Sequence, residues 1–392
     1  MTSHNSFFAH FQPQPADPLL KLIGEYRSDP RPEKIDVGVG VFRDVAGHTP
    51  VLNVVKKAER ILFERQTSKS YLGPEGNIAY AHALKTLVLG TEANGRTVAI
   101  QTPGGTGALR LAMDLIASAR SGAKLWVGTP SWPNHYGLAA AAGVEVCRYP
   151  FFDQKTQKVL FEETVTALQK AATGDVVLFH GCCHNPSGAG YTAAEWTVLA
   201  DLAAERGLIP LIDLAYQGLG DGFDADGAVT RQFLRRCDEV LVAYSCDKNF
   251  ALYRERVGAL FVRAANAAVA ETVFSNLLAL ARTNWSMPPD HGGAVVQTIL
   301  DDARLCNDWY AEVEMMRRRI ADVRNQLVEA DAAFAAIGTQ RGMFSLLPLS
   351  GEQVARLKSE FGIYMASSGR INVAGLTAAN IPHFVAAYRA VI

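Results

Sequence analysis

The sequence predicts an α/β fold, with a large domain built on a mainly parallel sheet flanked by helices and a smaller α/β domain beside it. Between about residues 95 and 262, short apolar runs alternate with helical patterns, as they do when helices cover both faces of a parallel sheet. The chain has 392 residues, of which 49% are hydrophobic, so it can bury a large core. Its length favours either two domains or one large domain with a smaller satellite.

Six apolar runs with the length of strands follow one another along the chain. They cover residues 98–101, 124–128, 176–180, 208–213, 240–244 and 257–262, and each ends near glycine or polar residues. A turn at 103–107 leads from the first run into an amphipathic helix at 108–119. Thr192 and Glu195 have the spacing of a capping box, which predicts that the helix before residue 208 begins there.

After Pro288 and Pro289 the sequence predicts a long connecting helix. Its apolar residues recur at threes and fours, as on a buried helix face: Trp309, Val313, Met316, Ile320, Val323 and Leu327. This spacing favours core packing over a site for a partner. From about residue 334 to the end, short strands mix with helices and predict the smaller domain, while residues 12–18 predict an N-terminal arm.

Charge and composition exclude several kinds of partner. Lys and Arg number 38 and Asp and Glu 39, so the chain lacks the overall basic field that favours nucleic acid or membrane binding. The first residues do not form a basic segment followed by an apolar run, and no stretch is long enough to span a bilayer. We therefore expect a cytoplasmic protein that acts on small molecules.

The six cysteines do not predict a disulfide framework in a chain of this length, and reduced thiols are typical of the cytosol. The run from His180 to His184, which includes Cys182 and Cys183, comes closest to the spacing of a zinc site, but no second cluster of ligands accompanies it. We therefore expect no metal and interpret the run as the end of a buried strand.

Candidate reactive residues follow the ends of the predicted strands, where parallel α/β sheets bind their ligands. Lys248 follows the run 240–244, and a lysine there is costly unless it reacts, for example by forming an imine with an aldehyde cofactor. Arg256 comes eight residues later and can pair with a phosphate dianion. Gly105 and Thr106 lie in a strand-to-helix turn, which can hold a phosphate through backbone amides but is often only a turn.

Asp213 ends another apolar run, and Tyr216 follows it closely. A partly buried carboxylate there must pair with a cation or suffer desolvation. A protonated pyridine nitrogen is a fitting partner, because the protonated ring can accept the electrons of a carbanion. On this motif alone, an aspartate that merely caps a helix and a tyrosine in the core remain the alternative.

These pieces occur in order over the whole chain, and together they resemble the class I aspartate/aromatic aminotransferases, which are fold-type I pyridoxal-phosphate enzymes. The resemblance is carried by the stretches 39–41, 71–73, 101–109, 130–135, 180–188, 213–218, 248–250, 256–258 and 368–375. It implies a seven-stranded sheet, pyridoxal 5′-phosphate as cofactor and a homodimer. It also implies an N-terminal arm with part of the small domain at 1–46, a cofactor-binding domain at 47–308 and a small domain at 309–392.

The resemblance assigns roles to individual residues. Lys248 would carry the cofactor as a Schiff base and move the substrate proton, Asp213 would pair with the ring nitrogen, and Trp132 would stack on the ring. The remaining cofactor contacts would come from Asn185, Tyr216, Gly105, Thr106, Ser245, Arg256 and, from the neighbouring subunit, Tyr71. Substrate contacts would come from Gly40, Trp132, Asn185, Arg370 and, again across the dimer, Arg282. His135 and His180 are candidate supports for Asp213, although the sequence alone favours a satisfied core histidine for each.

Two residues depart from the family pattern. Asp247 stands where related enzymes usually have a serine of the phosphate cup, and a second anion there is unfavourable unless it points away or pairs with a cation. Met287 stands at the pocket rim, where aspartate-preferring relatives usually have a small polar residue, and it favours apolar or aromatic substrate side chains.

The function expected from this resemblance is transfer of an amino group from an aromatic amino acid or aspartate to 2-oxoglutarate, by a ping-pong mechanism through Lys248. Three alternatives stay open: a strict aspartate aminotransferase, a ligand-binding or regulatory protein with a weakened cofactor site, and a lyase or decarboxylase on the same fold. Arg370 argues against decarboxylation, because it would hold the substrate carboxylate away from the labile position. The sequence does not decide between the donors.

Overall fold

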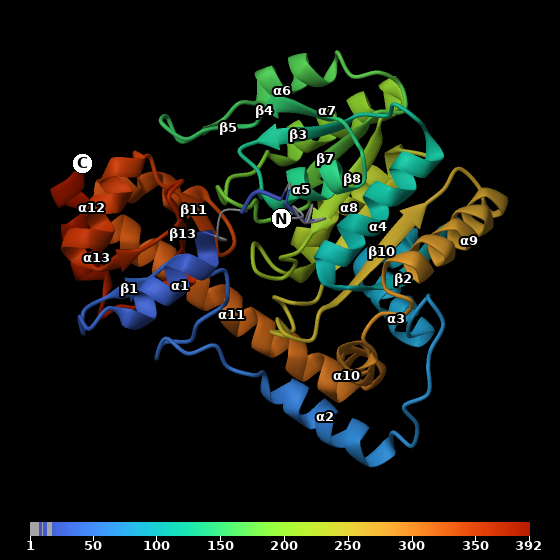
Figure 1. The fold of residues 1–392 in the computed structure, drawn as a ribbon, viewed down its shortest axis with the longest axis horizontal. Helices are drawn as coiled ribbons and strands as arrows, with labels where there is room; N and C mark the ends of the chain where they lie inside the picture. The colour runs from blue at the N-terminus through green and yellow to red at the C-terminus, as the bar shows by residue number, and fades with distance from the viewer. Residues whose placement is uncertain (1–7, 10, 14–17) are drawn as a thin grey trace, which may run out of the picture.

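The computed structural model describes residues 8–9, 11–13 and 18–392, and a seven-stranded sheet forms its centre (Figure 1). The strands are arranged in the order β2-β10-β9-β8-β7-β3-β4. Neighbours are parallel except that β10 runs antiparallel to both β2 and β9. The prediction of a mainly parallel, seven-stranded sheet is therefore confirmed. The strands are β2 (Thr97–Pro103), β3 (Leu125–Thr129), β4 (Val146–Pro150), β7 (Val176–His180), β8 (Ile209–Leu214), β9 (Val240–Ser245) and β10 (Val257–Arg263).

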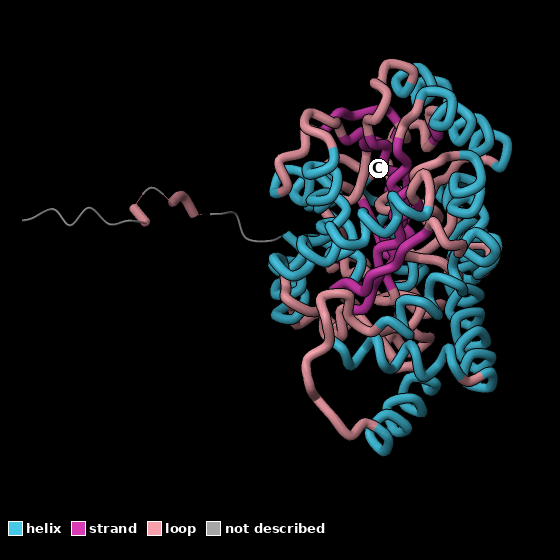
Figure 2. The backbone as a smooth tube through the Cα atoms, turned by 90° about the vertical axis from the view of Figure 1, so that its right-hand side faces the viewer, coloured by secondary structure: helices cyan, strands magenta, loops and turns pink. Residues whose placement is uncertain are grey.

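Helices cover both faces of this sheet, and the strands alternate between two apolar cores. Leu178 of β7 packs in the core shared with α4 (Gly104–Ala119), whereas its neighbours Val177 and Phe179 pack in the core shared with α7 (Ala193–Arg206). Figure 2 shows the strands in the middle of the molecule with helices on either side. The other helices of this region are α2 (Asn53–Arg65), α3 (Ile78–Leu89), α5 (Asn134–Ala141), α6 (Phe161–Leu168), α8 (Phe223–Arg236) and α9 (Ala267–Asn284), with the short η1 (Gly90–Glu92) and the hairpin β5 (Phe152–Asp153) and β6 (Lys158–Val159).

The predicted helix start at Thr192 is confirmed. The Thr192 hydroxyl accepts a hydrogen bond from the Glu195 amide at 3.3 Å, and the Glu195 carboxylate accepts one from the Thr192 amide at 2.7 Å. At its other end, α7 stops at Gly207, which has a φ of +62° that favours glycine. Helix α4 begins earlier than predicted, at Gly104, so the glycines of the 103–107 turn form its first turn.

The single long helix predicted after Pro289 is wrong in one respect, because the chain forms two helices there: α10 (Asp290–Asp301) and α11 (Ala303–Ala330). Asp302 separates them, and its carboxylate caps α11 by accepting hydrogen bonds from the amides of Arg304 at 2.8 Å and Leu305 at 3.1 Å. The apolar residues predicted on the buried face of α11 are all buried. Figure 1 shows α11 running from α10 to the smaller domain.

The smaller α/β domain draws on both ends of the chain, as predicted. Strand β1 (Ile35–Asp36) pairs in parallel with β12 (Ile363–Tyr364), and β11 (Phe344–Leu346) pairs antiparallel with β13 (Arg370–Asn372). Helices α1 (Pro18–Ser28), α12 (Gly351–Phe361) and α13 (Ile381–Val391) accompany these strands, with η2 (Ala332–Thr339) and η3 (Val373–Gly375).

The boundaries at residues 46 and 308 remain predictions, and the second falls within α11. Most of the arm predicted at 12–18 lies outside the described residues. None of the helices in the described part of the chain is long and apolar enough to cross a membrane.

Candidate active site

The candidate residues gather at the carboxyl ends of the parallel strands. Asp213 lies in β8 next to its end, Asn185 follows β7, and Lys248 follows β9. Ser245 ends β9, and Thr106 lies in the first turn of α4. Because carboxyl ends of neighbouring parallel strands meet at one edge, the sheet brings these residues together from separate parts of the sequence.

Asp213 is backed by a chain of two buried side chains. Nε2 of His135 lies 2.9 Å from Oδ2 of Asp213, and Nδ1 of the same ring lies 2.9 Å from the Ser131 hydroxyl. Burial raises the pKa of Asp213, but the hydrogen bond from His135 and nearby positive charges outweigh it and bring that pKa below its usual value. Trp132 packs its ring edge-on against His135, with centroids 5.2 Å apart. The carboxylate therefore stays ionised in a buried place, where it can hold a cationic partner.

Lys248 is half-buried above Tyr216. Its Nζ lies 5.4 Å from the centroid of the tyrosine ring. Burial lowers the pKa of Lys248, while the carboxylates of Asp247 and Asp213 act in the opposite direction. A lysine with a lowered pKa has a larger neutral fraction, which a nucleophile or a general base requires. Burial likewise raises the pKa of the Tyr216 hydroxyl, so it remains a hydrogen-bond donor.

Arg370 reaches the same place from the smaller domain. Its Nη2 donates to the Gly38 carbonyl at 3.0 Å and its Nη1 to the Asn185 side-chain oxygen at 3.4 Å, while the guanidinium carbon lies 4.5 Å from the centroid of the Phe344 ring. Its buried Nε has no hydrogen-bond partner among the described residues. Burial lowers the pKa of Arg370. None of the contacts recorded for it in the described chain is a carboxylate, so the fork is available to an incoming anion.

Gly40 lies beside this arginine. A Cβ atom at Gly40 would come within 2.8 Å of the Phe344 ring, so a side chain there would displace the ring against which Arg370 packs. Only glycine therefore leaves the Phe344 ring in place, and the role of Gly40 in binding substrate remains a prediction.

The N-terminus of α4, Ser245 and Arg256 form a cradle of the kind that binds phosphate. A Cβ atom at Gly104, which has a φ of +70°, would come within 2.5 Å of Nη2 of Arg256. A Cβ atom at Gly105 would meet that of Ser245 at 3.0 Å. The bare glycines leave the first backbone amides of α4 accessible, and the helix dipole favours an anion there. Arg256 itself has a φ of +53°, a strained conformation that is common at functional sites.

Asp247 does not remain a free anion in this cradle. Its Oδ2 lies 2.5 Å from Nη1 of Arg256, so the carboxylate pairs with the cation of the cradle. One of the two conditions that the sequence raised for an aspartate at this position is therefore met.

Tyr71 and Arg282 lie apart from this cluster. Tyr71, in the loop between α2 and α3, is 94% exposed, and Arg282, in the last turn of α9, is exposed and donates to the Ser286 hydroxyl. Within the described part of the chain, no hydrogen bond, ion pair or ring contact joins either of them to the residues above. The structure of one chain therefore leaves their predicted roles in the site untested.

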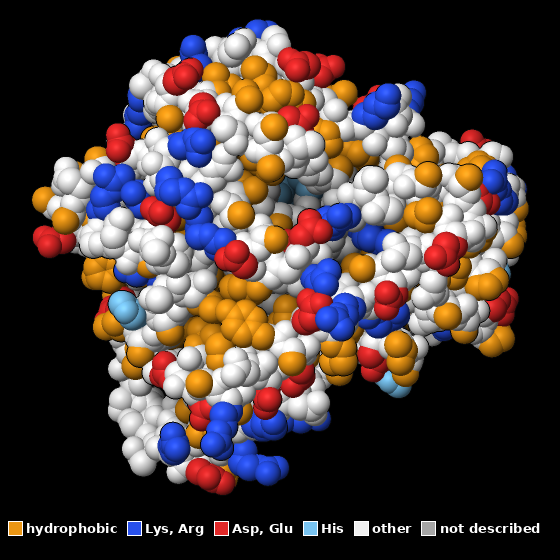
Figure 3. All heavy atoms as spheres, turned by 180° about the vertical axis from the view of Figure 1, so that it is seen from behind, with side chains coloured by type: hydrophobic (Ala, Val, Ile, Leu, Met, Phe, Trp, Pro, Cys, Tyr) orange, Lys and Arg blue, Asp and Glu red, His pale blue; other side chains and the backbone are white. Residues whose placement is uncertain are grey.

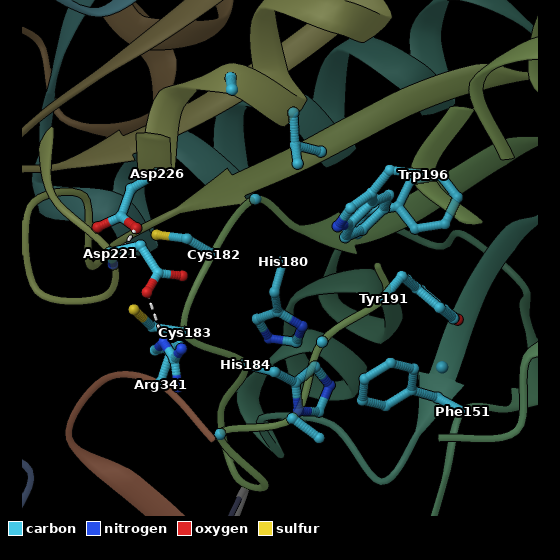
Figure 4. A pocket seen from close by; sticks show the side chains of 18 of the residues that line it. Phe151, His180, Cys182, Cys183, His184, Tyr191, Trp196, Asp221, Asp226 and Arg341 are labelled. Atoms are coloured by element: carbon cyan, nitrogen blue, oxygen red, sulfur yellow. Dashed lines mark hydrogen bonds and ion pairs between the residues drawn. The ribbon is translucent and has the colours of Figure 1, made fainter. Parts of the chain in front are cut away.

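A cavity of about 380 Å³ lies next to His180 (Figure 4). His180, His184, Phe151, Tyr191 and Trp196 line it, and the rings of His184 and Phe151 pack against each other with centroids 4.2 Å apart. His180 packs against His135 with ring centroids 5.2 Å apart, and its buried Nε2 has no protein partner among the described residues. Because the cavity is roomy and partly polar, water can occupy it.

Sequence reasoning missed three contributors to the site. Ser131 precedes His135 by four residues, a spacing that could have indicated their hydrogen bond. Phe344 and the carbonyl of Gly38 gave no signal, because both approach Arg370 only after the two ends of the chain fold together.

Comparison with known proteins identifies the family. Residues 32–387 match the model of the family "Aminotransferase class I and II". The tyrosine aminotransferase of Rhizobium meliloti (strain 1021) is 53% identical over 371 residues, covering 93% of this chain and 95% of that protein. The aspartate aminotransferase of Salmonella typhi is 44% identical over 395 residues, covering 98% and 100%.

A solved structure adds the three-dimensional match. The aromatic-amino-acid aminotransferase from Burkholderia pseudomallei, covalently bound to pyridoxal phosphate, has a TM-score of 0.95 at 40% identity and covers 98% of this chain and 99% of its own. Sequence, fold and the strand-end cluster around Lys248 agree, and the chain belongs to the class I and II aminotransferases.

Proposed function

We propose that this aminotransferase moves the amino group of an aromatic amino acid or of aspartate to 2-oxoglutarate, with pyridoxal phosphate bound at Lys248. The observation that carries the proposal is the convergence of three groups at the carboxyl end of the sheet: the half-buried amine of Lys248, the ionised Asp213 and, from the smaller domain, the guanidinium of Arg370, which has no carboxylate partner among the described residues. Relatives that act on tyrosine and on aspartate are both similar to the chain over nearly its full length, which supports the two donor classes.

The residues present fit this cofactor. Asp213, held by His135, is placed to pair with a protonated ring nitrogen, and Trp132 lies next to them with a large flat surface. Gly105, Thr106, Ser245 and Arg256 would hold the phosphate at the start of α4, where there is little room for a side chain at Gly104 or Gly105. When bound, the cofactor supplies a protonated ring that accepts electrons from the substrate α-carbon.

The chain's own side chains would bind and orient the substrate and move its proton. Arg370 would bind the α-carboxylate through its planar fork, which a lysine could not do equally well. The side-chain oxygen of Asn185, 3.4 Å from Nη1 of Arg370, would keep that fork in place, and Tyr216 would donate a hydrogen bond from its neutral hydroxyl. Lys248 would take the proton from the substrate α-carbon and deliver it to the C4′ carbon of the cofactor, and its lowered pKa suits a base. Two half-reactions at a single site give ping-pong kinetics.

The substrate side chain would meet residues of a second subunit. We infer a homodimer in which Arg282 and Tyr71 complete the partner's site, because both are exposed in the single chain. Arg282 would pair with the distal carboxylate of aspartate or 2-oxoglutarate, and the half-buried Met287 would offer an adaptable apolar surface to an aromatic ring. Met287 leads us to favour the aromatic donor.

The test compares the parent protein with Lys248→Ala, using phenylalanine, tyrosine and aspartate as donors and 2-oxoglutarate as acceptor. The parent should show a visible absorption band from the lysine-bound cofactor and turn over the aromatic donors with the highest kcat/KM. Lys248→Ala should lose the band and steady turnover. A variant within tenfold of the parent would refute the role of Lys248, and negligible aromatic activity in the parent would leave aspartate as the donor.

A further inference from the structure

Asp247 is a buried carboxylate fixed within the proposed phosphate cradle. It is 3% exposed. Its Oδ2 lies 2.5 Å from Nη1 of Arg256, its Oδ1 accepts from the Val257 amide at 3.3 Å, and its own amide donates to the Ser245 hydroxyl at 3.2 Å. These contacts hold the carboxylate on Arg256, so it cannot turn away to solvent.

The two terminal nitrogens of Arg256 therefore face two different groups. Nη1 faces Asp247, and Nη2 lies at the start of α4, 2.5 Å from the place of a Cβ atom on Gly104. A Cβ atom there would also come within 3.2 Å of Oδ2 of Asp247, so this carboxylate reaches the same point at the helix N-terminus. A phosphate bound at this point would share one guanidinium with a carboxylate and would lie close to a like charge.

The two effects of Asp247 on a phosphate oppose each other. The short ion pair fixes the orientation of Arg256, which favours binding because less side-chain entropy is lost. The negative charge offsets that of Arg256 and repels the dianion, and such interactions are strong where water is largely excluded. Orientation needs only a hydrogen-bond acceptor, whereas repulsion needs the charge, so the two effects can be separated by substitution.

We propose that Asp247 sets how tightly this enzyme retains its cofactor: the carboxylate orients Arg256, but its charge makes the cradle release the phosphate group more readily than a neutral residue would. This inference rests on the proposed function, because it assumes that the phosphate of the cofactor occupies the cradle. It implies that the loaded fraction of the enzyme responds to the supply of free cofactor.

The experiment measures cofactor retention rather than activity. Holoenzyme is diluted in series, free pyridoxal phosphate is separated by ultrafiltration, and the Kd is obtained for the parent, Asp247→Asn and Asp247→Ala. Asn keeps the size and an acceptor for Arg256 but removes the charge, so its Kd should fall at least about tenfold, or about 1.4 kcal/mol. Asp247→Ala removes both the charge and the acceptor for Arg256, so its Kd should fall less than that of Asp247→Asn. Ser245→Ala, which loses a hydroxyl of the cradle, should raise the Kd and serves as the control in the other direction.

Pyridoxal, which lacks the phosphate, separates the cradle from Lys248. The same proteins loaded with pyridoxal should show equal Kd values for the parent and Asp247→Asn. An equal fall in the Kd for pyridoxal would mean that the charge of Asp247 acts through Lys248. An unchanged or higher Kd for pyridoxal phosphate in Asp247→Asn would mean that this charge does not weaken phosphate binding. Either result overturns the inference while the proposed function stands. A parent protein that neither binds pyridoxal phosphate nor shows the visible band would overturn both.

Discussion

Asp213 and His180 are neighbours on adjacent strands and both contact His135, yet the carboxylate is ionised and the His180 ring is neutral. Asp213 accepts a hydrogen bond from Nε2 of His135, which helps to keep the carboxylate ionised although it is buried. His180 packs its ring against His135, and burial together with the charge of that neighbour lowers the pKa of His180 to about 3. The neutral ring of His180 therefore adds no positive charge beside the His135–Asp213 pair at neutral pH.

This neutral state makes stability depend on pH. The pKa of His180 in the folded chain, about 3, lies below its ordinary value of 6.5, so the unfolded chain binds the proton more strongly. The contribution is complete above about pH 6.5 and is lost as the pH falls toward 3. Between pH 7 and pH 5, one such histidine lowers the free energy of unfolding by about 2 kcal/mol.

His180→Gln has no group at this position that takes up a proton. Between pH 7 and pH 5, its free energy of unfolding, measured in urea, should therefore fall by about 2 kcal/mol less than that of the parent. The same pH dependence in both proteins would contradict the neutral state. Histidine ring signals in NMR provide an independent check, because those of His180 should not shift between these two pH values.

At the scale of elements, the sequence predicted those structures whose pattern is local. The six predicted strands all form, because each is a short apolar run that is largely buried in the sheet. The seventh, β4, lies at the sheet edge and includes the exposed Arg148, so its pattern is not that of a buried strand. The break at Asp302 was missed because the apolar spacing continues across it, and only the capping hydrogen bonds of its carboxylate end one helix and start the next.

The candidate site could likewise be predicted only where local sequence patterns place its residues. Lys248 and Asp213 could be placed from the sequence because each lies at or just after the end of an apolar run, and strand ends meet, whereas Asn185 was assigned only through the resemblance. The surroundings of Arg370 could not, because its neighbours Gly38 and Phe344 come from strands and loops at opposite ends of the chain. The pairing of Asp247 with Arg256 likewise needed side-chain geometry, since spacing alone left its orientation open.

Helix α11 also supports the site through a buried arginine that the sequence did not indicate. Arg324 is 3% exposed, and its guanidinium donates to the carbonyls of Gly342 at 2.6 Å and Phe344 at 2.7 Å, and to the Ser345 hydroxyl at 2.8 Å. Burial lowers the pKa of Arg324 to about 9. These bonds hold β11 to α11, and β11 carries the Phe344 ring against which Arg370 packs.

Arg324→Met keeps much of the volume but leaves these acceptors without a donor. Each buried unpaired group costs about 1–3 kcal/mol, so we expect the free energy of unfolding to fall by at least about 3 kcal/mol. Arg318→Met, on the same helix but with a side chain 72% exposed, is the matched control and should change it by about 0.5 kcal/mol or less. Urea unfolding measures both, and similar losses in the two variants would mean that the buried network adds no stability.

At the scale of the whole molecule, the surface of the single chain is consistent with a partner. Large apolar side chains are exposed in the segment from α2 to α3, among them Phe63, Tyr71 and Ile78. Figure 3 shows apolar surface gathered in a broad patch on the face opposite to that of Figure 1. Contiguous apolar surface of this kind is typical of protein interfaces. Arg282, a residue proposed to bind substrate, is exposed on a single chain, which fits a site completed by two copies.

The two-subunit site can be tested by mixing inactive proteins. Lys248→Ala homodimers should be inactive with every donor, and Arg282→Ala homodimers should be inactive with aspartate, because nothing then pairs with its distal carboxylate. If Arg282 crosses to the partner, a heterodimer has one site with both defects and one site with neither. Equal amounts, fully exchanged, form heterodimers in about half of the molecules, so aspartate turnover should return to about a quarter of the parental value. If Arg282 acted within its own subunit, each heterodimer site would lack one of the two residues, and no activity would return despite proven exchange. The half-reaction of phenylalanine alone, followed by the change in the visible band without 2-oxoglutarate, serves as the internal control, because phenylalanine has no distal carboxylate and the Arg282→Ala homodimer should carry it out at close to the parental rate.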